Sequence, residues 1–214
     1  MKNTVLFCSG LSGSGKSYFI NNVLPTNMFH NLKSATTRPM RDGEQNGREY
    51  YFRDEKYFET VNFATYLWVN EAFWKPGTPK WLYGVPEFEI FDHIGQNFTY
   101  DVIQPRYVRQ MIDWFVRKRL HSNYDFKIAW FKPINNAQDV VKNRQNMPND
   151  ILVRQTNTCN ADDFKAVNLQ PDFTIQFNPT SGYNIQTHGG DGLVLPDLSM
   201  ETILLQYSLL SNTK

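Results

Sequence analysis

The 214-residue chain has little cysteine, little net charge and no long apolar run. Its two cysteines, Cys8 and Cys159, form no C-x-x-C pair, so we expect neither a disulfide nor a cysteine metal site. With 22 basic and 21 acidic residues, the net charge of +1 argues against general attraction to nucleic acid or to anionic membranes. No apolar run approaches the ~20 residues that span a bilayer. A strand-like segment starts at once, so we expect no signal peptide and a cytoplasmic protein.

One eight-residue segment carries the strongest signal in the chain. Residues 10–17 read GLSGSGKS and fill every fixed position of the phosphate-loop pattern G-x-x-x-x-G-K-[ST]. An apolar, strand-like run precedes this loop at residues 4–8, and helical spacing follows it over residues 16–24. The order strand, glycine loop, helix is the one that binds phosphates, so a chance glycine-rich turn is the weaker interpretation.

The chemistry of this loop predicts an ATP site. Its glycines let successive backbone N–H groups turn inward around a polyphosphate. We expect Lys16 to reach the β- and γ-phosphates and the Ser17 hydroxyl to bind Mg²⁺. The predicted ATP-binding residues are Gly10, Leu11, Ser12, Gly13, Ser14, Gly15, Lys16 and Ser17.

The order of the predicted elements indicates an α/β fold. Strand-like segments at residues 98–103, 127–131 and 173–177 alternate with helical ones, among them an amphipathic helix that begins at Pro105. This alternation is typical of a mostly parallel central sheet covered on both faces, which is the three-layer fold of P-loop NTPases. The sequence also predicts short strands at 50–52 and 66–69, and helices at 54–59, from Pro86, at 136–146, at 148–158 and from Ser199.

A second group of polar side chains suits a phosphate. Arg38, Arg41 and Tyr50 stand close together on a polar, turn-rich segment. Two guanidinium forks and a phenol match phosphate oxygens, because arginine binds phosphate in a planar, bidentate way. Composition alone leaves surface charge on a loop as an equally good interpretation.

A longer pattern separates these two interpretations. Residues 34–52 read SATTRPMRDGEQNGREYYF and fill every fixed position of the signature S-x-T-T-R-x-x-R-x-G-E-x-x-G-x-x-Y-x-F. The chain therefore resembles the guanylate kinase family, up to about residue 178. The resemblance implies a kinase that transfers the γ-phosphoryl group of ATP, with Mg²⁺, to a nucleoside monophosphate. The favoured acceptor is (d)GMP or a related or modified nucleotide, so the expected partners are small-molecule nucleotides.

The resemblance also assigns roles to individual residues. It implies three cationic catalytic residues that neutralise the transferring phosphoryl group: Lys16, Arg144 and Arg154. It implies a set that binds the phosphate and the base of the acceptor: Ser34, Arg38, Arg41, Tyr50, Glu71, Tyr83 and Asp101. No general base is needed, because a monophosphate dianion is already a nucleophile; catalysis is then positioning and charge neutralisation.

The resemblance implies one domain over residues 1–214. Its core comprises residues 1–33, 96–135 and 159–180, with a subdomain at 34–95 that binds the monophosphate and a lid at 136–158. Residues 181–214 are a C-terminal extension that either packs on the sheet or contacts a second copy, so the chain is a monomer or a homodimer. Within this extension, His188 and Asp191 suit a mobile glycine-rich loop better than a metal site.

Three departures from the family pattern concern the base and the lid. Val85 stands where the family has a Ser or Thr that donates to guanine O6. Trp74 and Trp81 either stack on a different base or pack the subdomain. In the predicted lid, residues 144–147 read RQNM, where the family usually has R-x-T-E. Phosphoryl transfer is therefore better supported than guanine specificity.

Two other classes of function stay open. One is a catalytically silent guanylate-kinase-like module that binds a protein, although such modules usually have a damaged phosphate loop. The other is a kinase that acts on a modified base within nucleic acid, against which the near-neutral charge argues.

Overall fold

The alternating side chains of the first strand organise the described part of the chain. The computed structural model describes residues 2–11, 14–24, 28–69, 81–102, 104–132, 159–178 and 182–187. β1 (Asn3–Gly10) has nearly every residue buried. Val5 and Phe7 join one apolar cluster, and Leu6 and Cys8 join another on the opposite face. β1 is therefore the central strand of a sheet that is covered on both sides.

The main sheet has six strands in the order β10-β9-β8-β1-β7-β2. Its other strands are β2 (Phe29–Asn31), β7 (Asn97–Val102), β8 (Tyr124–Phe131), β9 (Phe173–Asn178) and β10 (Gly182–Thr187). Every neighbouring pair is parallel except β9 with β10. The predicted α/β fold with a mostly parallel sheet is confirmed. The sheet also continues past residue 180, because β10 forms its edge.

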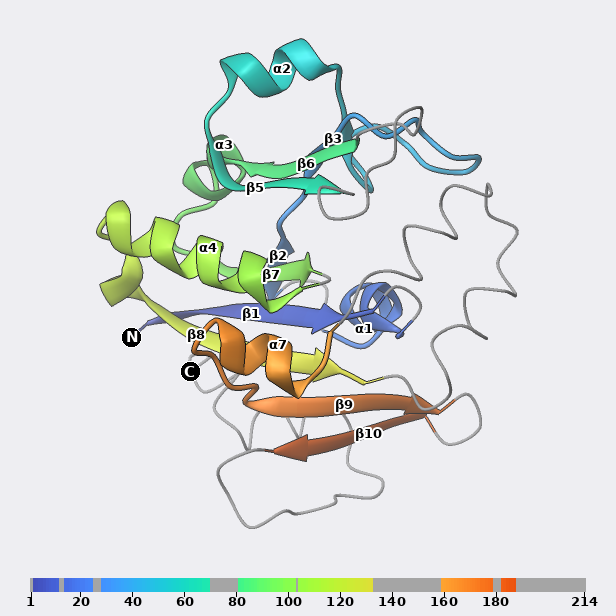
Figure 1. Cartoon of the computed structure of the whole chain (residues 1–214), viewed down its shortest axis with the longest axis vertical. Helices are drawn as coiled ribbons and strands as arrows, with labels where there is room; N and C mark the ends of the chain where they lie inside the picture. Colours follow the sequence, from blue (N-terminus) through green and yellow to red (C-terminus); the bar gives the residue numbers. More distant parts are fainter. Residues whose placement is uncertain are drawn as a thin grey trace.

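Helices cover both faces of this sheet (Figure 1). α4 (Pro105–Arg117) and α7 (Ala161–Ala166) bury Val108, Met111, Phe115 and Phe164 in the cluster of Val5. α1 (Lys16–Asn22) buries its apolar side chains in the cluster of Leu6, on the other face. A single 3-10 turn, η1 (His121–Asn123), leads into β8. Among the described residues, no helix has both the length and the apolar character needed to cross a membrane.

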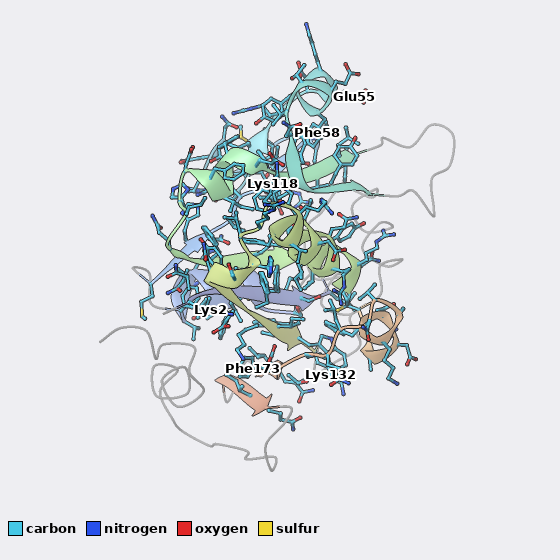
Figure 2. The ribbon with its side chains drawn as sticks, turned by 90° about the vertical axis from the view of Figure 1, so that its left-hand side faces the viewer. Lys2, Glu55, Phe58, Lys118, Lys132 and Phe173 are labelled. Atoms are coloured by element: carbon cyan, nitrogen blue, oxygen red, sulfur yellow. The ribbon has the colours of Figure 1, made fainter. Side chains whose placement is uncertain are left out.

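A smaller, four-stranded sheet stands over α4 at the top of Figure 1. Its strands are β4 (Tyr51–Phe52), β3 (Ala35–Thr36), β6 (Trp81–Pro86) and β5 (Phe63–Val69), in that order. α2 (Glu55–Thr60) covers the outer face, where Phe58 joins Ala35 and Leu82 in a small core. Figure 2 shows Phe58 on the inner side of α2 and Glu55 farther out. α3 (Glu87–Phe91) follows β6.

The local sequence signals place most of the described elements correctly. The strands expected around residues 4–8, 66–69, 98–103, 127–131 and 173–177 are present, and so are the helices at Pro105 and at 54–59. α3 starts at Glu87, because Pro86 ends β6 and caps the helix. β2, β3, β6, β10 and α7 were not predicted. The helices expected at 136–146, at 148–158 and from Ser199 lie outside the described residues, as do His188 and Asp191.

A buried carboxylate connects the two sheets. Glu89 of α3 is 1% exposed. Its Oε1 accepts hydrogen bonds from His30 Nε2 at 2.9 Å and from the Lys33 backbone N–H at 3.1 Å. Its Oε2 accepts one from the Tyr51 hydroxyl at 2.7 Å. Because His30 belongs to β2 and Tyr51 to β4, this carboxylate holds the smaller sheet in place over the main one.

The network around Glu89 predicts a pH-dependent contribution to stability. Burial opposes ionisation, but the hydrogen bonds from His30 and Tyr51 outweigh it and lower the pKa of Glu89. A carboxyl group with a lowered folded-state pKa stabilises the fold above its unfolded pKa, and that stability is lost as the pH falls through the lower folded value. We expect Glu89→Gln to reduce the free energy of unfolding by roughly 2 kcal/mol at neutral pH, with the deficit shrinking below about pH 4.

Urea unfolding of the wild type and of Glu89→Gln across this pH range measures the effect. Glu59→Gln, a change at an exposed glutamate of α2, is the matched control. A deficit that persists undiminished at pH 3 would show that the ionised carboxylate is not the stabilising group.

Candidate functional site

The described part of the phosphate loop is shaped by close approach and by a left-handed turn. A Cβ on Gly10 would lie 2.5 Å from the Phe131 carbonyl oxygen of the neighbouring strand, so only glycine fits there. Gly15, which caps α1, has φ +92°, a conformation that favours glycine. Ser12 and Gly13 lie outside the described residues. The glycines at 10 and 15 therefore let the chain turn sharply between β1 and α1.

Lys16 and Ser17 converge on one carboxylate. The Lys16 side chain is only 6% exposed; its Nζ donates to the carbonyls of Gly10 and Leu11 at 2.8 and 2.9 Å. The same ammonium lies 3.6 Å from Asp101 Oδ1. The exposed Ser17 hydroxyl donates to Asp101 Oδ2 at 2.9 Å. Asp101 stands near the end of β7, beside β1, so parallel pairing brings it to the loop.

This arrangement fits ATP and Mg²⁺. The Ser17 hydroxyl and the Asp101 carboxylate are the hard oxygen ligands that Mg²⁺ prefers when it also binds phosphates. Ser14 Oγ is buried and has no hydrogen-bond partner among the described residues, so it is available to a phosphate oxygen. Across the described residues no group of three or more His, Cys, Asp or Glu side chains forms a metal site of its own. Ser17 and Asp101 therefore supply two oxygen ligands for a metal that also binds the phosphates of a nucleotide.

Arg38 is the centre of the second predicted site. It is 3% exposed, and its guanidinium donates to Glu44 Oε1 and Oε2 at 2.8 and 3.0 Å and to the Pro39 carbonyl at 2.7 Å. Burial works against its charge, but the hydrogen bond to Glu44 and the charges of Tyr83, Glu44 and Tyr50 together outweigh burial and raise the pKa of Arg38. The pKa of Glu44 is lowered, because its contacts with Arg38 and Arg41 overcome burial. Arg38 is thus fully charged and fixed in orientation.

Two tyrosines complete this cluster. The rings of Tyr50 and Tyr83 meet edge to face with centroids 5.8 Å apart, and the Arg38 guanidinium lies 5.4 Å from the centre of the Tyr50 ring. Removal from water and the neighbouring Tyr83 raise the pKa of Tyr50, and the charge on Asp101 raises it further. The charge on Asp101, which contacts Lys16 and Ser17, therefore also acts on the second cluster.

The structure brings most of the predicted acceptor residues together. Arg41 acts on Tyr83 electrostatically, and its backbone N–H donates to Glu44 Oε2 at 2.8 Å. Ser34 lies beside Tyr100 of β7. Glu71, Arg144 and Arg154 lie outside the described residues, so their predicted roles stay predictions.

Sequence reasoning assigned no role to Glu44, although its position is fixed in the signature. The Glu44 carboxylate accepts hydrogen bonds from the Arg38 guanidinium and from the Arg41 backbone N–H. It therefore holds the turn that carries both arginines. Only two residues separate Arg41 from Glu44, and the Glu44 N–H also donates to the Arg41 carbonyl at 3.1 Å. The signal that could have identified it is the acid itself, which follows both arginines on a short, turn-rich segment.

Comparison with known proteins gives one consistent result. No family model matches the chain. It is 41% identical over 76 residues to a guanylate kinase of Photobacterium profundum, a match that covers 34% of this chain and 36% of that protein. It is 39% identical over 105 residues to a guanylate kinase of Prochlorococcus marinus, covering 46% of this chain and 53% of that protein. The chain thus spans about a third to a half of the length of such relatives.

Among solved structures, a guanylate kinase of Anaplasma phagocytophilum is similar at 16% identity with a TM-score of 0.42, over 78% of this chain and 81% of that one. A third curated relative, a guanylate kinase of Clostridium tetani, is 36% identical over 83 residues, covering 37% of this chain and 39% of that protein. These repeated matches make the chain similar to guanylate kinases over about a third to a half of its length.

Proposed function

We propose that the chain is an ATP-dependent nucleoside monophosphate kinase, with (d)GMP or a related nucleotide as the acceptor. The observation that carries this proposal is the position of Asp101. It binds Ser17 and lies near Lys16 in the phosphate loop, and its charge also acts on Tyr50 in the Arg38 cluster. A triphosphate at the first site and a monophosphate at the second would therefore meet with their phosphates toward each other.

The residues of the chain supply positioning and charge for in-line transfer. Arg38, Arg41, Tyr50 and Tyr83 hold the acceptor phosphate, one oxygen of which attacks the γ-phosphorus of ATP. The new P–O bond forms as the bond to the β,γ-bridging oxygen breaks, and ADP leaves. Lys16 stabilises the charge that develops on the transferring group. Mg²⁺, held by Ser17 and Asp101, would neutralise charge on the β- and γ-phosphates.

Family resemblance extends the proposal to residues beyond those described. Arg144 and Arg154 would close over the phosphates from a lid at residues 136–158, and Glu71 would bind the acceptor base. Residues 34–95, which contain the smaller sheet, would form the subdomain that binds the monophosphate. The proposal includes a cytoplasmic location and a monomeric or homodimeric state.

An ADP-release assay with ATP and Mg²⁺ against all common ribo- and deoxyribonucleoside monophosphates tests the proposal. We expect turnover with at least one of them, and with GMP or dGMP among the acceptors. Absence of turnover with every monophosphate, in a folded protein that still binds ATP, would refute the kinase function. That outcome would favour the silent binding module, and salt-dependent DNA binding would favour a kinase for a base in nucleic acid.

A further inference from the structure

The smaller sheet carries the Arg38 cluster, and two connections join it to the main sheet. The chain leaves the main sheet after β2, over residues 32–34, and returns over residues 87–96, which include α3 and lead into β7. Arg38, Tyr50 and Tyr83 all lie between these connections, whereas Asp101 belongs to β7 of the main sheet. The orientation of the Arg38 cluster relative to the phosphate loop therefore depends on the two connections.

The buried Glu89 carboxylate contacts both connections and the acceptor segment at once. Glu89 belongs to α3, in the second connection, and its Oε1 accepts from the backbone N–H of Lys33 in the first. The Lys33 ammonium lies 3.9 Å from the same oxygen. Oε2 accepts from the hydroxyl of Tyr51, which directly follows Tyr50 in the sequence. One side chain thus links the two connections to the segment that carries the Arg38 cluster.

A pair of stacked histidines joins the same two connections. The rings of His30 and His93 have centroids 3.6 Å apart and planes 15° from parallel. His30 ends the main-sheet side of the first connection, and His93 lies in the second, after α3. His93 Nδ1 is 3.1 Å from the Glu89 carbonyl oxygen, which can only accept, so the ring donates. Both imidazoles are therefore held against Glu89, one by its side chain and one by its backbone.

The choice of a carboxylate for this joint indicates that direction matters there. A buried carboxylate loses its hydration, and apolar side chains of similar volume often give equal or greater stability. Hydrogen bonds differ from apolar packing because they weaken steeply when their angle or length changes. Contacts from His30, Lys33 and Tyr51 to one carboxylate are all satisfied in one orientation of the smaller sheet.

In-line transfer needs such an orientation, because the reacting atoms must approach within about 3–3.5 Å. We propose that Glu89 is a positioning residue for phosphoryl transfer, which with His30 and His93 fixes the smaller sheet where both phosphate sites bind one continuous chain of phosphates. The inference rests on the proposed kinase function and deepens it.

This role has a signature that a loss of stability alone does not produce. The Arg38 cluster is built within the smaller sheet, by contacts of Arg38 with Glu44 and Tyr50, so a monophosphate can bind it in either orientation. The phosphate loop is likewise built within the main sheet, by contacts of Lys16 with its own loop. A ligand that bridges both sites depends in addition on their relative placement, through the effective concentration of the second site. Losing Glu89 should therefore weaken a bridging ligand and spare the separate nucleotides.

Calorimetric titration of Glu89→Gln with ATP, with GMP, and with adenosine and guanosine joined through a chain of phosphates tests the proposal. The amide has a single acceptor oxygen, so it cannot accept from His30, Lys33 and Tyr51 together. We expect the affinity for the joined compound and kcat each to fall about tenfold, with the affinities for ATP and GMP within about twofold of the wild type. Tyr51→Phe, which keeps its ring and removes one hydrogen bond, should show the same pattern at about threefold and decides the question if Glu89→Gln does not fold.

Two control variants separate position from stability. Tyr57→Phe removes a hydroxyl from α2 in the same part of the fold, where the ring packs on Phe58 and Phe63. Ile175→Val trims the buried core of β9, away from both connections. Both should bind the joined compound within about twofold of the wild type.

The possible failures are distinguishable. If Glu89→Gln or a folded Tyr51→Phe weakens all three ligands equally, or leaves the joined compound unaffected, Glu89 is only structural; the proposal is then overturned while the kinase function stands. If the joined compound does not displace both ATP and GMP from the wild type, the two-site arrangement itself fails, and the inference fails with it.

Discussion

Lys16→Ala should reduce phosphoryl transfer by about 10³-fold or more, because the charge closest to the transferring group is removed. The lysine is buried and contacts both the loop carbonyls and Asp101, so no other described cation takes the same position. Transfer is measured as ADP release at saturating ATP and acceptor. The loss should appear in kcat and not only in the KM for ATP, since the charge on the phosphates grows in the transition state.

The control for Lys16→Ala is stability. Removing the ammonium leaves the Gly10 and Leu11 carbonyls without its hydrogen bonds, which costs roughly 1–2 kcal/mol. Lys16→Met keeps the apolar stem and serves as a second variant if the alanine variant unfolds. Lys56→Ala, at an exposed position of α2, should be unaffected. Wild-type turnover in a folded Lys16 variant would remove the lysine from the mechanism.

Arg41→Met should raise the acceptor KM by about 10- to 100-fold and lower kcat, with little change in ATP binding. The turn that presents Arg41 is held through its backbone N–H by Glu44, and Glu44 is paired with Arg38. Losing the Arg41 side chain therefore leaves the fold of the turn intact. Arg38 is a less clean test, because its removal would leave the Glu44 carboxylate half-buried and unpaired.

Arg48→Met is the matched control for Arg41→Met. Arg48 lies on the same segment but is exposed and paired with Glu49, so its loss should leave the acceptor KM within about twofold of the wild type. Steady-state kinetics with varied acceptor at saturating ATP, together with an ATP titration of each variant, measures both effects. Weakened ATP affinity with an unchanged acceptor KM would place Arg41 at the wrong site.

The sequence predicts well those features that depend on a short run of neighbouring residues. The phosphate loop, the strand before it and the helix at Pro105 follow from local pattern, because glycine, alternation and amphipathic spacing act over a few residues. The contact between Arg38 and Tyr50 followed from the signature at 34–52, which places both residues on one short segment.

What the sequence does not predict are partnerships between distant segments. Glu89 forms hydrogen bonds with His30, 59 positions away in the sequence, and with Tyr51, 38 positions away. Thr65 forms one with Tyr100, 35 positions away. Nothing near either residue signals its partner. β6 was overlooked because Gly84 and Pro86 interrupt its strand pattern. Gly84 is in fact required there: a Cβ at this position would lie 2.6 Å from the Phe63 ring.

The central claim is that two nucleotides bind end to end, with their phosphates between Lys16 and Arg41. Calorimetric titration with adenosine and guanosine joined through a chain of phosphates tests it most directly. We expect one molecule to bind per chain, to displace both ATP and GMP, and to bind more weakly to Lys16→Ala and to Arg41→Met alike. Displacement of only one nucleotide, or sensitivity to only one of the two substitutions, would contradict a shared site.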